Sequence, residues 1–513
     1  MTTPVVDAVA THTRNNPAAL ACMDLDSGVR WTYGEFDRAI NRVANWLVTR
    51  LGPASGARVA TQARNRAETM ILYLACVRAG AIFVPLNWRL SAAEVCQLLG
   101  DAAPSLFFFD VEFELADIDI DAWPLSDLLS LTQSCDEAAV EARRDFNDTS
   151  LLLYTSGTSG KPKGVMVTEA NVFWSNVNFS LSNRVSCESV FLCDMPLFHT
   201  AGLVTNARAP LTAGGALLVS RGFDASKTLA RIADAGLGIT HYFSVPQMAQ
   251  MLWNHQDFAP EKLRGLQVYA TGGAPNPAAQ IERFVNAGIP MSDGFGMTES
   301  GSNFGMPVAN RQLLIDKAGS CGLPYLCLET RLVGDDGQPV AIGEPGELWV
   351  RGPCVSPGYW NQPELTAQAY TDGWFCTGDI ARKDEDGFFY IVDRKKDMFI
   401  SGGENVYPVE VEAAIAKLDA VAEVAVVGVP DDIWGERGVA FIVAATTLEV
   451  DTVHQHCESL LAKYKVPKEF VLVDSIPRTG SGKAIKPQLV EQAKQLEQIK
   501  NLSWVKGEGP VLQ

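Results

Sequence analysis

The chain has 513 residues, 47% of them hydrophobic, so it is long and apolar enough for at least two globular domains. Its 42 basic and 60 acidic residues give a formal net charge of −18, which argues against nucleic acid or an anionic membrane surface as a partner. The eleven cysteines have no Cys-x-x-Cys spacing, which indicates free thiols in a reducing compartment rather than a disulfide framework or a zinc site.

These features favour a cytoplasmic protein. Residues 1–14 are polar and lack the apolar core of a signal peptide, and no apolar run is long enough to span a membrane. The last residues, 510–513, do not form a peroxisomal signal. We therefore expect no integral membrane segment. Composition leaves the oligomeric state open, and a homodimer is one of the states considered.

Helical and strand patterns alternate near the N-terminus. Thr32 and Glu35 have the spacing of a capping box, and apolar residues recur at helical spacing behind them. A second helical pattern over 68–78 stops at Gly80, and the apolar run 81–85 then reads as a buried strand. This alternation predicts α/β layers.

Three alternating aspartates, Asp117, Asp119 and Asp121, invite a comparison with a calcium-binding loop. They lack the ligand spacing and the closing glutamate of such a loop, so a solvated loop is expected.

A hydroxyl- and glycine-rich run lies between two apolar stretches, 151–153 and 165–167, that read as strands. Glycines let backbone N–H groups approach an anion closely, and hydroxyls and lysines add donors and positive charge. The alternative is an ordinary surface turn. The run is not a P-loop, because Lys161 is followed by Pro162 and not by Ser or Thr. It predicts a loop that binds the phosphates of ATP, through Thr155, Ser156, Gly157, Thr158, Ser159, Gly160, Lys161 and Lys163.

Further along, a single histidine and a glycine turn are candidates for the site. His199 stands among aromatic and small residues, and by itself it is better explained as a hydrogen-bonded core histidine. A predicted strand ends in Gly272, Gly273 and Ala274, at the place where open α/β sheets bind ligands, and the glycines would admit a flat ring. A hairpin signal at 335–337 begins a β-rich stretch.

Four more segments follow, at Asp293–Glu299, Asp372–Asp379, Asp393–Glu412 and Pro477–Lys486. With the glycine-rich run, they resemble in type and order the adenylate-forming superfamily, which contains acyl-CoA synthetases, luciferases and the adenylation domains of peptide synthetases. The resemblance covers roughly the whole chain. It implies an α/β fold, with a large N-terminal domain of α/β layers and a β subdomain over 1–395. A small mobile α+β domain would follow over 396–513, with a hinge at Lys396.

The resemblance also implies a two-step reaction. A carboxylate attacks the α-phosphorus of ATP to give acyl-AMP and pyrophosphate, and a thiol then displaces AMP. Lys483 matches the family's adenylation lysine, which bridges the substrate carboxylate and the α-phosphate. Thr298 would touch the α-phosphate, and Glu299 would hold Mg²⁺, because a hard cation prefers carboxylate oxygen. His199 would line the carboxylate pocket, as histidine does in many acyl- and aryl-CoA ligases.

Other residues are implied to hold the nucleotide and the thiol. Phe295 would lie against adenine, and Asp293, where the family usually has an amide, would accept from the adenine amino group. Gly294 and Gly296 flank Phe295 in the same segment. Asp379 would bind the ribose hydroxyls with Arg394. The turn at Ser401, Gly402 and Gly403 would face the active site when the thiol enters.

The implied activity is an AMP-forming acyl-CoA ligase that uses ATP, Mg²⁺ and coenzyme A. No carrier domain follows Lys483, and residues 196–202 lack an aspartate for an α-ammonium group, which favours free CoA and a simple carboxylic acid. Apolar residues around the expected pocket indicate a medium- or long-chain fatty acid or an aryl or arylalkanoic acid, without deciding between them. Two alternatives are a luciferase-like oxygenase and a non-catalytic homologue that binds acyl or nucleotide ligands.

Overall fold

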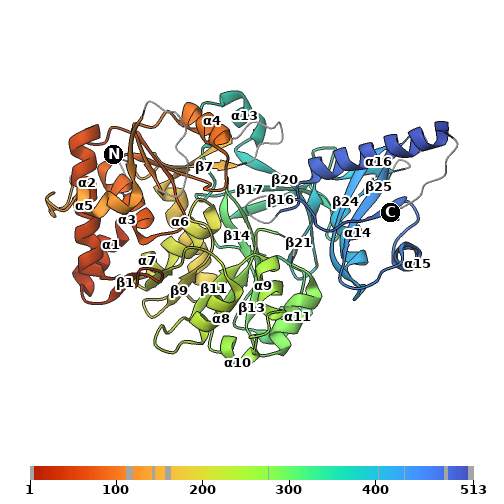
Figure 1. The fold of residues 1–513 in the computed structure, drawn as a ribbon, viewed down its shortest axis with the longest axis horizontal. Coiled ribbons are helices and arrows are strands. Elements are labelled where there is room, and N and C mark those ends of the chain that lie inside the picture. The colour runs from red at the N-terminus through yellow and green to blue at the C-terminus, as the bar shows by residue number, and fades with distance from the viewer. Residues whose placement is uncertain are drawn as a thin grey trace. The chain divides into compact units, whose positions relative to one another are not determined.

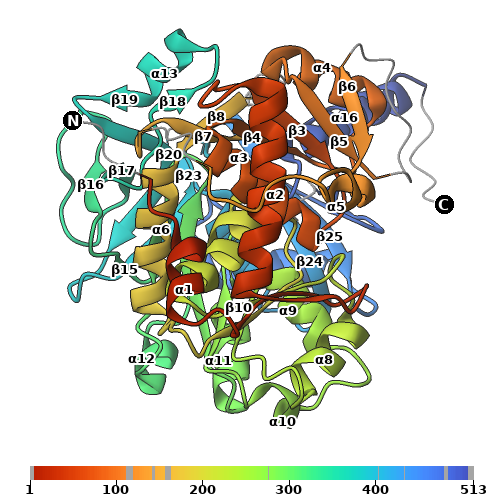
Figure 2. The same ribbon diagram turned by 90° about the vertical axis from the view of Figure 1, so that its left-hand side faces the viewer.

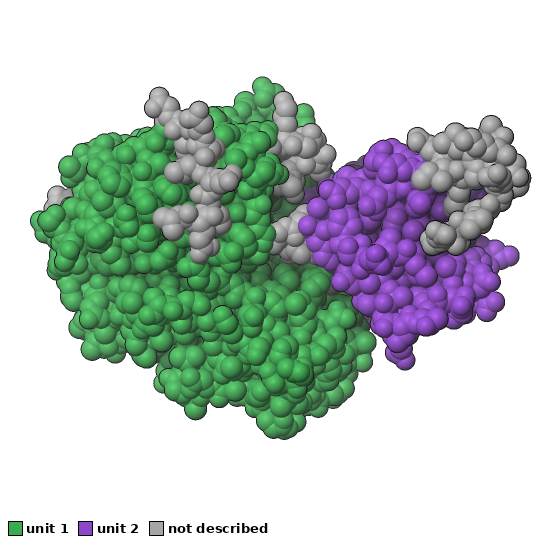
Figure 3. All heavy atoms as spheres, viewed as in Figure 1, with its two compact units in different colours: residues 1–330, 349–376 green, residues 331–348, 377–513 purple. Residues whose placement is uncertain are grey.

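The computed structural model describes residues 5–110, 120–140, 145–155, 163–274, 276–401, 404–431, 434–478 and 483–506. The chain forms two compact units (Figure 3). The first contains residues 1–330 and 349–376, and the second contains residues 331–348 and 377–513. This grouping places 377–395 with the C-terminal residues. The domain boundary after residue 395 and the hinge at Lys396 stay predictions.

The first unit contains a seven-stranded sheet. Its strand order is β18 (Gly358–Tyr359), β8 (Lys163–Thr168), β7 (Thr149–Thr155), β4 (Ile82–Leu86), β3 (Arg58–Gln62), β5 (Leu106–Phe109) and β6 (Asp121–Pro124). The strands from β7 through β4, β3 and β5 to β6 are parallel, whereas β7 and β8 form an antiparallel pair. The two ends of the predicted phosphate loop, Thr155 and Lys163, are paired across β7 and β8.

A nine-stranded sheet forms the second layer of this unit. Its strand order is β15 (Leu323–Pro324), β14 (Gly301–Gly305), β13 (Met291–Met297), β12 (Val268–Thr271), β11 (His241–Ser244), β9 (Val190–Cys193), β10 (Ala216–Val219), β1 (Leu20–Asp24) and β2 (Arg30–Thr32). The strands from β1 to β13 are parallel, so their carboxyl ends meet at one edge. The glycine turn after β12 therefore lies beside the second half of β13.

Helices cover these sheets, as Figures 1 and 2 show. Those of the first unit are α1 (Ala8–Asn15), α2 (Tyr33–Leu51), α3 (Ala67–Ala79), α4 (Ala92–Ala102), α5 (Leu128–Leu131), α6 (Glu169–Ser182), α7 (Ala209–Ala213), α8 (Ala225–Ala233), α9 (Pro246–Trp253), α10 (Pro260–Leu263), α11 (Ala278–Asn286), α12 (Arg311–Asp316) and α13 (Pro363–Ala369). A short 3₁₀ turn, η1 (Leu125–Asp127), and a π-helical segment, η2 (Ala201–Arg208), complete the set.

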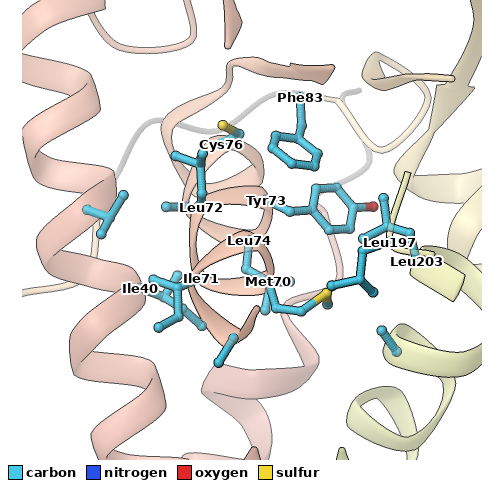
Figure 4. Packing of buried hydrophobic residues seen from close by; sticks show 14 of the residues in the cluster. Ile40, Met70, Ile71, Leu72, Tyr73, Leu74, Cys76, Phe83, Leu197 and Leu203 are labelled. Carbon is cyan, nitrogen blue, oxygen red and sulfur yellow. The ribbon is translucent and has the colours of Figure 1, made fainter. Parts of the chain in front are cut away.

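Helix α3 lies in the centre of the largest hydrophobic cluster (Figure 4). It is apolar on nearly all sides, because it packs between α2 and strands of both sheets. Met70, Ile71 and Tyr73 are fully buried in this cluster, together with Phe83 of β4 and Leu203 of η2. The cluster holds the two layers of the unit as one body.

A third sheet follows the order β16 (Glu329–Val333), β17 (Gly346–Arg351), β20 (Trp374–Lys383) and β19 (Tyr370–Thr371), and β21 (Phe389–Arg394) pairs with β20. The division between the two units falls within β16, β17 and β20. A five-stranded sheet forms the centre of the second unit. Its order is β23 (Glu404–Val406), β22 (Phe399–Ser401), β25 (Gly435–Ala444) and β24 (Val421–Asp431), with β26 (Glu469–Leu472) on β25. Its helices are α14 (Pro408–Ile415), α15 (Val450–Leu460) and α16 (Lys486–Lys506).

Most elements predicted from the sequence are present. Thr32 and Glu35 form the capping box of α2, and α3 ends at Gly80, which is left-handed with φ +72. The hairpin at 335–337 is closed by an antiparallel bridge between Val333 and Pro339. Of the three alternating aspartates, Asp121 begins β6 and pairs with Arg50 at 2.7 Å, which differs from the expected loop; Asp117 and Asp119 lie outside the described residues.

All eleven cysteines are free thiols, as predicted. Within the described part of the chain, no helix has both the length and the apolarity that crossing a membrane requires.

Candidate active site

The base of the predicted phosphate loop is held by the pairing of β7 with β8 and by a tyrosine hydrogen bond. Tyr154 donates a hydrogen bond from its hydroxyl to Asp101 at 2.6 Å, and the next residue, Thr155, pairs with Lys163. The ammonium of Lys163 lies 5.3 Å from the ring centroid of Tyr359, within cation–π range. The loop between these ends, with Ser156, Gly157, Thr158, Ser159, Gly160 and Lys161, lies outside the described residues.

Glu299, the predicted magnesium ligand, is held by the segment that contains β18. Tyr359 donates a hydrogen bond from its hydroxyl to the Glu299 carboxylate at 3.0 Å, and the Ser356 N–H donates to the Glu299 carbonyl at 2.7 Å. The side chain is half-buried. Because Tyr359 contacts both Lys163 and Glu299, it places the base of the phosphate loop and the candidate metal ligand in one neighbourhood.

The glycine turn after β12 and the predicted adenine segment lie side by side. A Cβ atom added to Gly272 would lie 3.0 Å from the carbonyl oxygen of Gly294 and 3.4 Å from the Phe243 ring. A side chain at this position would therefore fill the narrow space that the turn leaves open. Gly273 has φ +83, a conformation that favours glycine, and Ala274 ends the described turn. Phe295 is partly exposed beside them and lies 6.0 Å from Phe304, edge to face.

Asp293 is buried just before these residues. Thr271 donates a hydrogen bond from its hydroxyl to the Asp293 carboxyl group at 2.8 Å. Burial raises the pKa of Asp293 to about 8, against the opposing effects of the Thr271 hydroxyl and the Gly294 N–H. At neutral pH this side chain is therefore mainly a carboxylic acid, which can donate as well as accept a hydrogen bond.

His199 lies just before the π-helical segment η2, and Thr298 lines a cavity with residues of η2 and α6. The rings of Phe198 and His199 lie 4.5 Å apart, and the His199 carbonyl accepts from the Leu203 N–H at 2.8 Å. Thr298 lines a small cavity with Ser175, Thr200, Val204, Cys354 and Ser356. Phe243, Val245 and Ala201 pack together in an apolar cluster of the same unit.

Two thiols lie next to this cavity. Cys327 donates a hydrogen bond to Asn178 at 2.9 Å, and a hydrogen bond from the Cys354 thiol lowers the pKa of Cys327 to about 7. The same pairing, together with burial, raises the pKa of Cys354.

In the second unit, Asp379 and Arg394 form the predicted pair. They are opposite residues of β20 and β21, and their side chains form an ion pair at 2.8 Å. The Asp379 side chain is only 3% exposed, and its backbone N–H donates to the Thr377 hydroxyl at 3.0 Å. A buried, oriented carboxylate of this kind suits recognition of sugar hydroxyls.

Of the other predicted residues of the second unit, Lys396 lies in the turn between β21 and β22, Ser401 ends β22, and Lys483 lies just before α16. Lys396 is exposed and lines a cavity of about 170 Å³ with Asp397, Met398 and Lys486. Ser401 is buried and pairs with Gly435, while Gly402 and Gly403 lie outside the described residues. Lys483 is exposed, and residues 479–482 before it lie outside the described residues.

The residues present fit the groups that the reaction requires. Glu299 offers a half-buried carboxylate for a hard cation, Gly272 leaves space for a flat ring, and the Asp379 carboxylate is buried beside Arg394. Sequence reasoning missed Tyr359 and Ser356, which hold Glu299. The sequence around Tyr359 gave little signal, because a tyrosine after a glycine is common. Both residues are also far from Glu299 along the chain, so no local pattern indicates the contact.

The sequence matches the family model for AMP-binding enzymes over residues 7–360. It also matches the model for the AMP-binding enzyme C-terminal domain over residues 410–483. The chain belongs to the AMP-binding enzyme family. The two matches lie in the order that the sequence predicted.

Relatives in this family are similar along nearly their whole length. A feruloyl-CoA synthase from Amycolatopsis is 38% identical over 90% of this chain and 94% of its own. An indoleacetate–CoA ligase from Aromatoleum aromaticum is 36% identical over 91% and 94%. The long-chain-fatty-acid–CoA ligase FadD13 of Mycobacterium tuberculosis is 35% identical over 93% and 96%.

Solved structures of AMP-binding enzymes have the same fold. ATP-bound MatB from Rhodopseudomonas palustris has a TM-score of 0.89 and 30% identity, covering 96% of this chain and 99% of MatB. The o-succinylbenzoate CoA synthetase of Bacillus subtilis, in complex with ATP and a magnesium ion, has a TM-score of 0.86 and 30% identity, covering 95% of this chain and 100% of that one. The predicted α/β fold with a large N-terminal and a smaller C-terminal part is confirmed.

Proposed function

We propose that this AMP-binding enzyme is an ATP-dependent acid–CoA ligase whose natural substrate is an aromatic carboxylic acid. The ligase class rests on family membership and on relatives that are CoA ligases over nearly the whole chain. The enzyme uses ATP with Mg²⁺ to form an acyl-AMP, and CoA as the acyl acceptor. Among the relatives reported above, none is a luciferase or a non-catalytic protein, so neither alternative gains support.

The first half-reaction brings two anions together. A substrate carboxylate must approach the α-phosphate of ATP, so positive charge and oriented donors have to offset the repulsion. Lys483 would contact the substrate carboxylate and the α-phosphate, and Thr298 would donate its hydroxyl to the phosphate. Glu299, oriented by Tyr359, would hold Mg²⁺, which supplies positive charge to the phosphate oxygens.

The resemblance assigns the adenine and the ribose of the nucleotide to two sets of residues. Phe295 and the turn at 272–274 would enclose the adenine, and Asp293 would meet its edge. Asp379 and Arg394 would bind the ribose hydroxyls, since the buried carboxylate already has a fixed orientation. In the second half-reaction, the turn at 401–403 would guide the CoA thiol to the acyl carbon.

The aromatic substrate class is supported by the relatives that act on feruloyl and indoleacetate groups and by the site itself. The single observation that carries it is a set of buried aromatic and apolar side chains around the chain segment 198–201. Phe198 lies 4.5 Å from His199, and Phe243 and Val245 share one cluster with Ala201. Rigid aromatic walls match a planar ring well, because ring contacts add to the gain from burial.

A panel of acids scored by AMP formation with CoA tests both class and specificity. We expect arylpropenoic and arylacetic acids to react with higher kcat/KM than hexadecanoate or acetate. Lys483→Ala should lower acyl-AMP formation at least a hundredfold, which corresponds to about 2.7 kcal/mol. It should spare transfer from preformed acyl-AMP to CoA. A preference for hexadecanoate would move the enzyme to the fatty-acid branch, and no AMP with any acid would contradict the ligase itself.

A further inference from the structure

The segment that carries Lys483 is fixed at both of its ends to the body of the second unit. On the incoming side, the guanidinium of Arg478 pairs with Glu423 of β24 at 2.6 Å. Arg478 and Ala484 form an antiparallel bridge, and the Ile485 N–H donates to the Pro477 carbonyl at 2.8 Å. On the outgoing side stands Lys486, the first residue of α16.

Lys486 lies in a polar cluster beneath the surface. Its ammonium is 3.3 Å from the carboxylate of Glu412 on α14, and the two side chains are only 16% and 20% exposed. Burial works to lower the pKa of Lys486, but the carboxylates of Glu412, Asp393 and Asp397 outweigh it and raise this pKa. The charged lysine is therefore favoured by acidic groups from three places in the chain.

The same carboxylates hold the strand that leads to Lys396. Asp393, 2% exposed, accepts hydrogen bonds from the Arg394 N–H at 2.6 Å and from the Val409 N–H at 3.0 Å. Glu412 accepts from the Val426 N–H at 2.8 Å. Lys486 and Lys396 also line one cavity. Lys486 thus connects the end of β21, helix α14 and the start of α16.

We propose that Lys486 is a positioning residue: its buried ammonium fixes the segment of Lys483 to Glu412 of α14. The proposal rests on the proposed function only for its effect on catalysis. Lys483 has a flexible stem and must reach one geometry in the transition state, so its backbone has to be held by other groups. Lys486 is three residues away and, unlike Lys483, is buried among carboxylates.

Loss of the Lys486 ammonium should affect the two half-reactions differently. Loss of the ammonium leaves Glu412 without its cation and releases the outgoing end of the segment. Adenylation requires Lys483 and should fall, whereas transfer from preformed acyl-AMP does not require it. Lys486→Arg keeps the positive charge, so it should keep most of the wild-type adenylation rate.

The test compares wild type with Lys486→Met, Lys486→Arg and the matched control Lys494→Met, an exposed lysine on the same helix. We expect Lys486→Met to slow single-turnover pyrophosphate release at least tenfold and to change transfer from acyl-AMP to CoA less than threefold. The rate of pyrophosphate release in Lys486→Arg should stay within about threefold of the wild-type rate. Lys494→Met should have the wild-type rate. Equal slowing of both half-reactions would overturn the positioning role.

A second variant separates positioning from folding. In Lys486→Met/Glu412→Gln the unpaired carboxylate of Glu412 is removed, so the melting temperature should recover relative to Lys486→Met, while adenylation stays low. If adenylation recovers together with the melting temperature, Lys486 is only a structural residue and the proposal is wrong.

Amide hydrogen exchange gives a readout that does not need activity. Residues 484–489 should exchange faster in Lys486→Met than in wild type, and at the wild-type rate in Lys486→Arg. Unchanged exchange in Lys486→Met overturns the inference even if the enzyme is active. Absence of acyl-AMP in wild type would instead contradict the proposed function, while the exchange pattern would still decide the role of Lys486.

Discussion

At the scale of single residues, the charge of a side chain in this site is set by its surroundings. Asp293 is buried beside a hydroxyl group, and burial raises its pKa to about 8. Cys327 has a neighbouring thiol that donates to it, which lowers its pKa to about 7. Both shifts depend on contacts with residues distant in sequence, so the residue type alone would have given the wrong charge.

Asp293 should make stability depend on pH. Its pKa in the folded state lies above its ordinary value of 3.8, so its favourable contribution is full below about pH 4 and is lost as the pH rises through about 8. Asp293→Asn removes this titration. We expect the free energy of unfolding of Asp293→Asn, relative to wild type, to be more than about 1 kcal/mol higher at pH 8 than at pH 5. One unit of pKa difference corresponds to about 1.4 kcal/mol.

Urea unfolding without nucleotide at pH 5 and pH 8 measures this difference. The control is Asp335→Asn, a substitution at an exposed aspartate of the hairpin, whose effect should be the same at both pH values. The same stability difference at pH 5 and pH 8 for Asp293→Asn would contradict a raised pKa.

Cys327 should react with iodoacetamide in a pH-dependent way. Its thiolate forms with a pKa of about 7 because Cys354 donates to it. In wild type, mass spectrometry should show a labelling midpoint near pH 7, and Cys354→Ala should move that midpoint upward by removing the donor. An unchanged midpoint in Cys354→Ala would show that Cys354 does not control this thiol.

At the scale of elements, β13 decides where Thr298 and Glu299 lie. Its first half pairs in parallel with β12, and its second half pairs antiparallel with β14. The register shifts between Phe295 and Gly296, where β14 has one extra residue, Asn303, and such a bulge increases the local twist of the pair. Thr298 and Glu299 follow the end of this pair, and the Glu299 carboxylate accepts a hydrogen bond from Tyr359.

Gly296→Ala should disrupt the pairing of β13 with β14. An added Cβ would overlap the carbonyl oxygen of Gly301, which belongs to the backbone and has little freedom to move. We expect a loss of more than about 1 kcal/mol in the free energy of unfolding, and a weaker affinity for ATP measured by calorimetry. Gly100→Ala is the control, because Gly100 lies inside α4 with open space around it and should gain about 0.5–1 kcal/mol. Equal effects of the two substitutions would refute the steric argument.

At the scale of the whole molecule, the candidate residues belong to two units. The phosphate loop, Asp293 and Glu299 belong to the first, whereas Asp379, Arg394 and Lys483 belong to the second. A reaction with two half-reactions and residues on two bodies favours a change of domain pose between the steps. The predicted hinge at Lys396 remains the point at which we expect that change.

Lys396→Pro should uncouple the half-reactions, because proline fixes φ near −65° and removes the rotation that the second pose needs. We expect one half-reaction to fall at least tenfold more than the other in single-turnover assays. Lys396→Ala, which keeps the backbone free, should change both rates less than threefold. If proline leaves both half-reactions at the wild-type rate, the hinge lies elsewhere.

The sequence alone indicated α/β layers through local patterns: a capping box starts α2, and Gly80 ends α3. The reaction class came from the resemblance of the glycine-rich run and four further segments, in their order, to the adenylate-forming superfamily. Such features depend on residues close together in the chain, where spacing has a direct physical meaning.

Only the tertiary structure showed what holds these residues. Tyr359 lies 60 residues from Glu299 in sequence and donates to it, and burial, not residue type, keeps Asp293 largely protonated. Lys486 is paired with Glu412, which lies 74 positions earlier in the sequence. Contacts and burial of this kind arise when distant segments pack together, and no local pattern carries them.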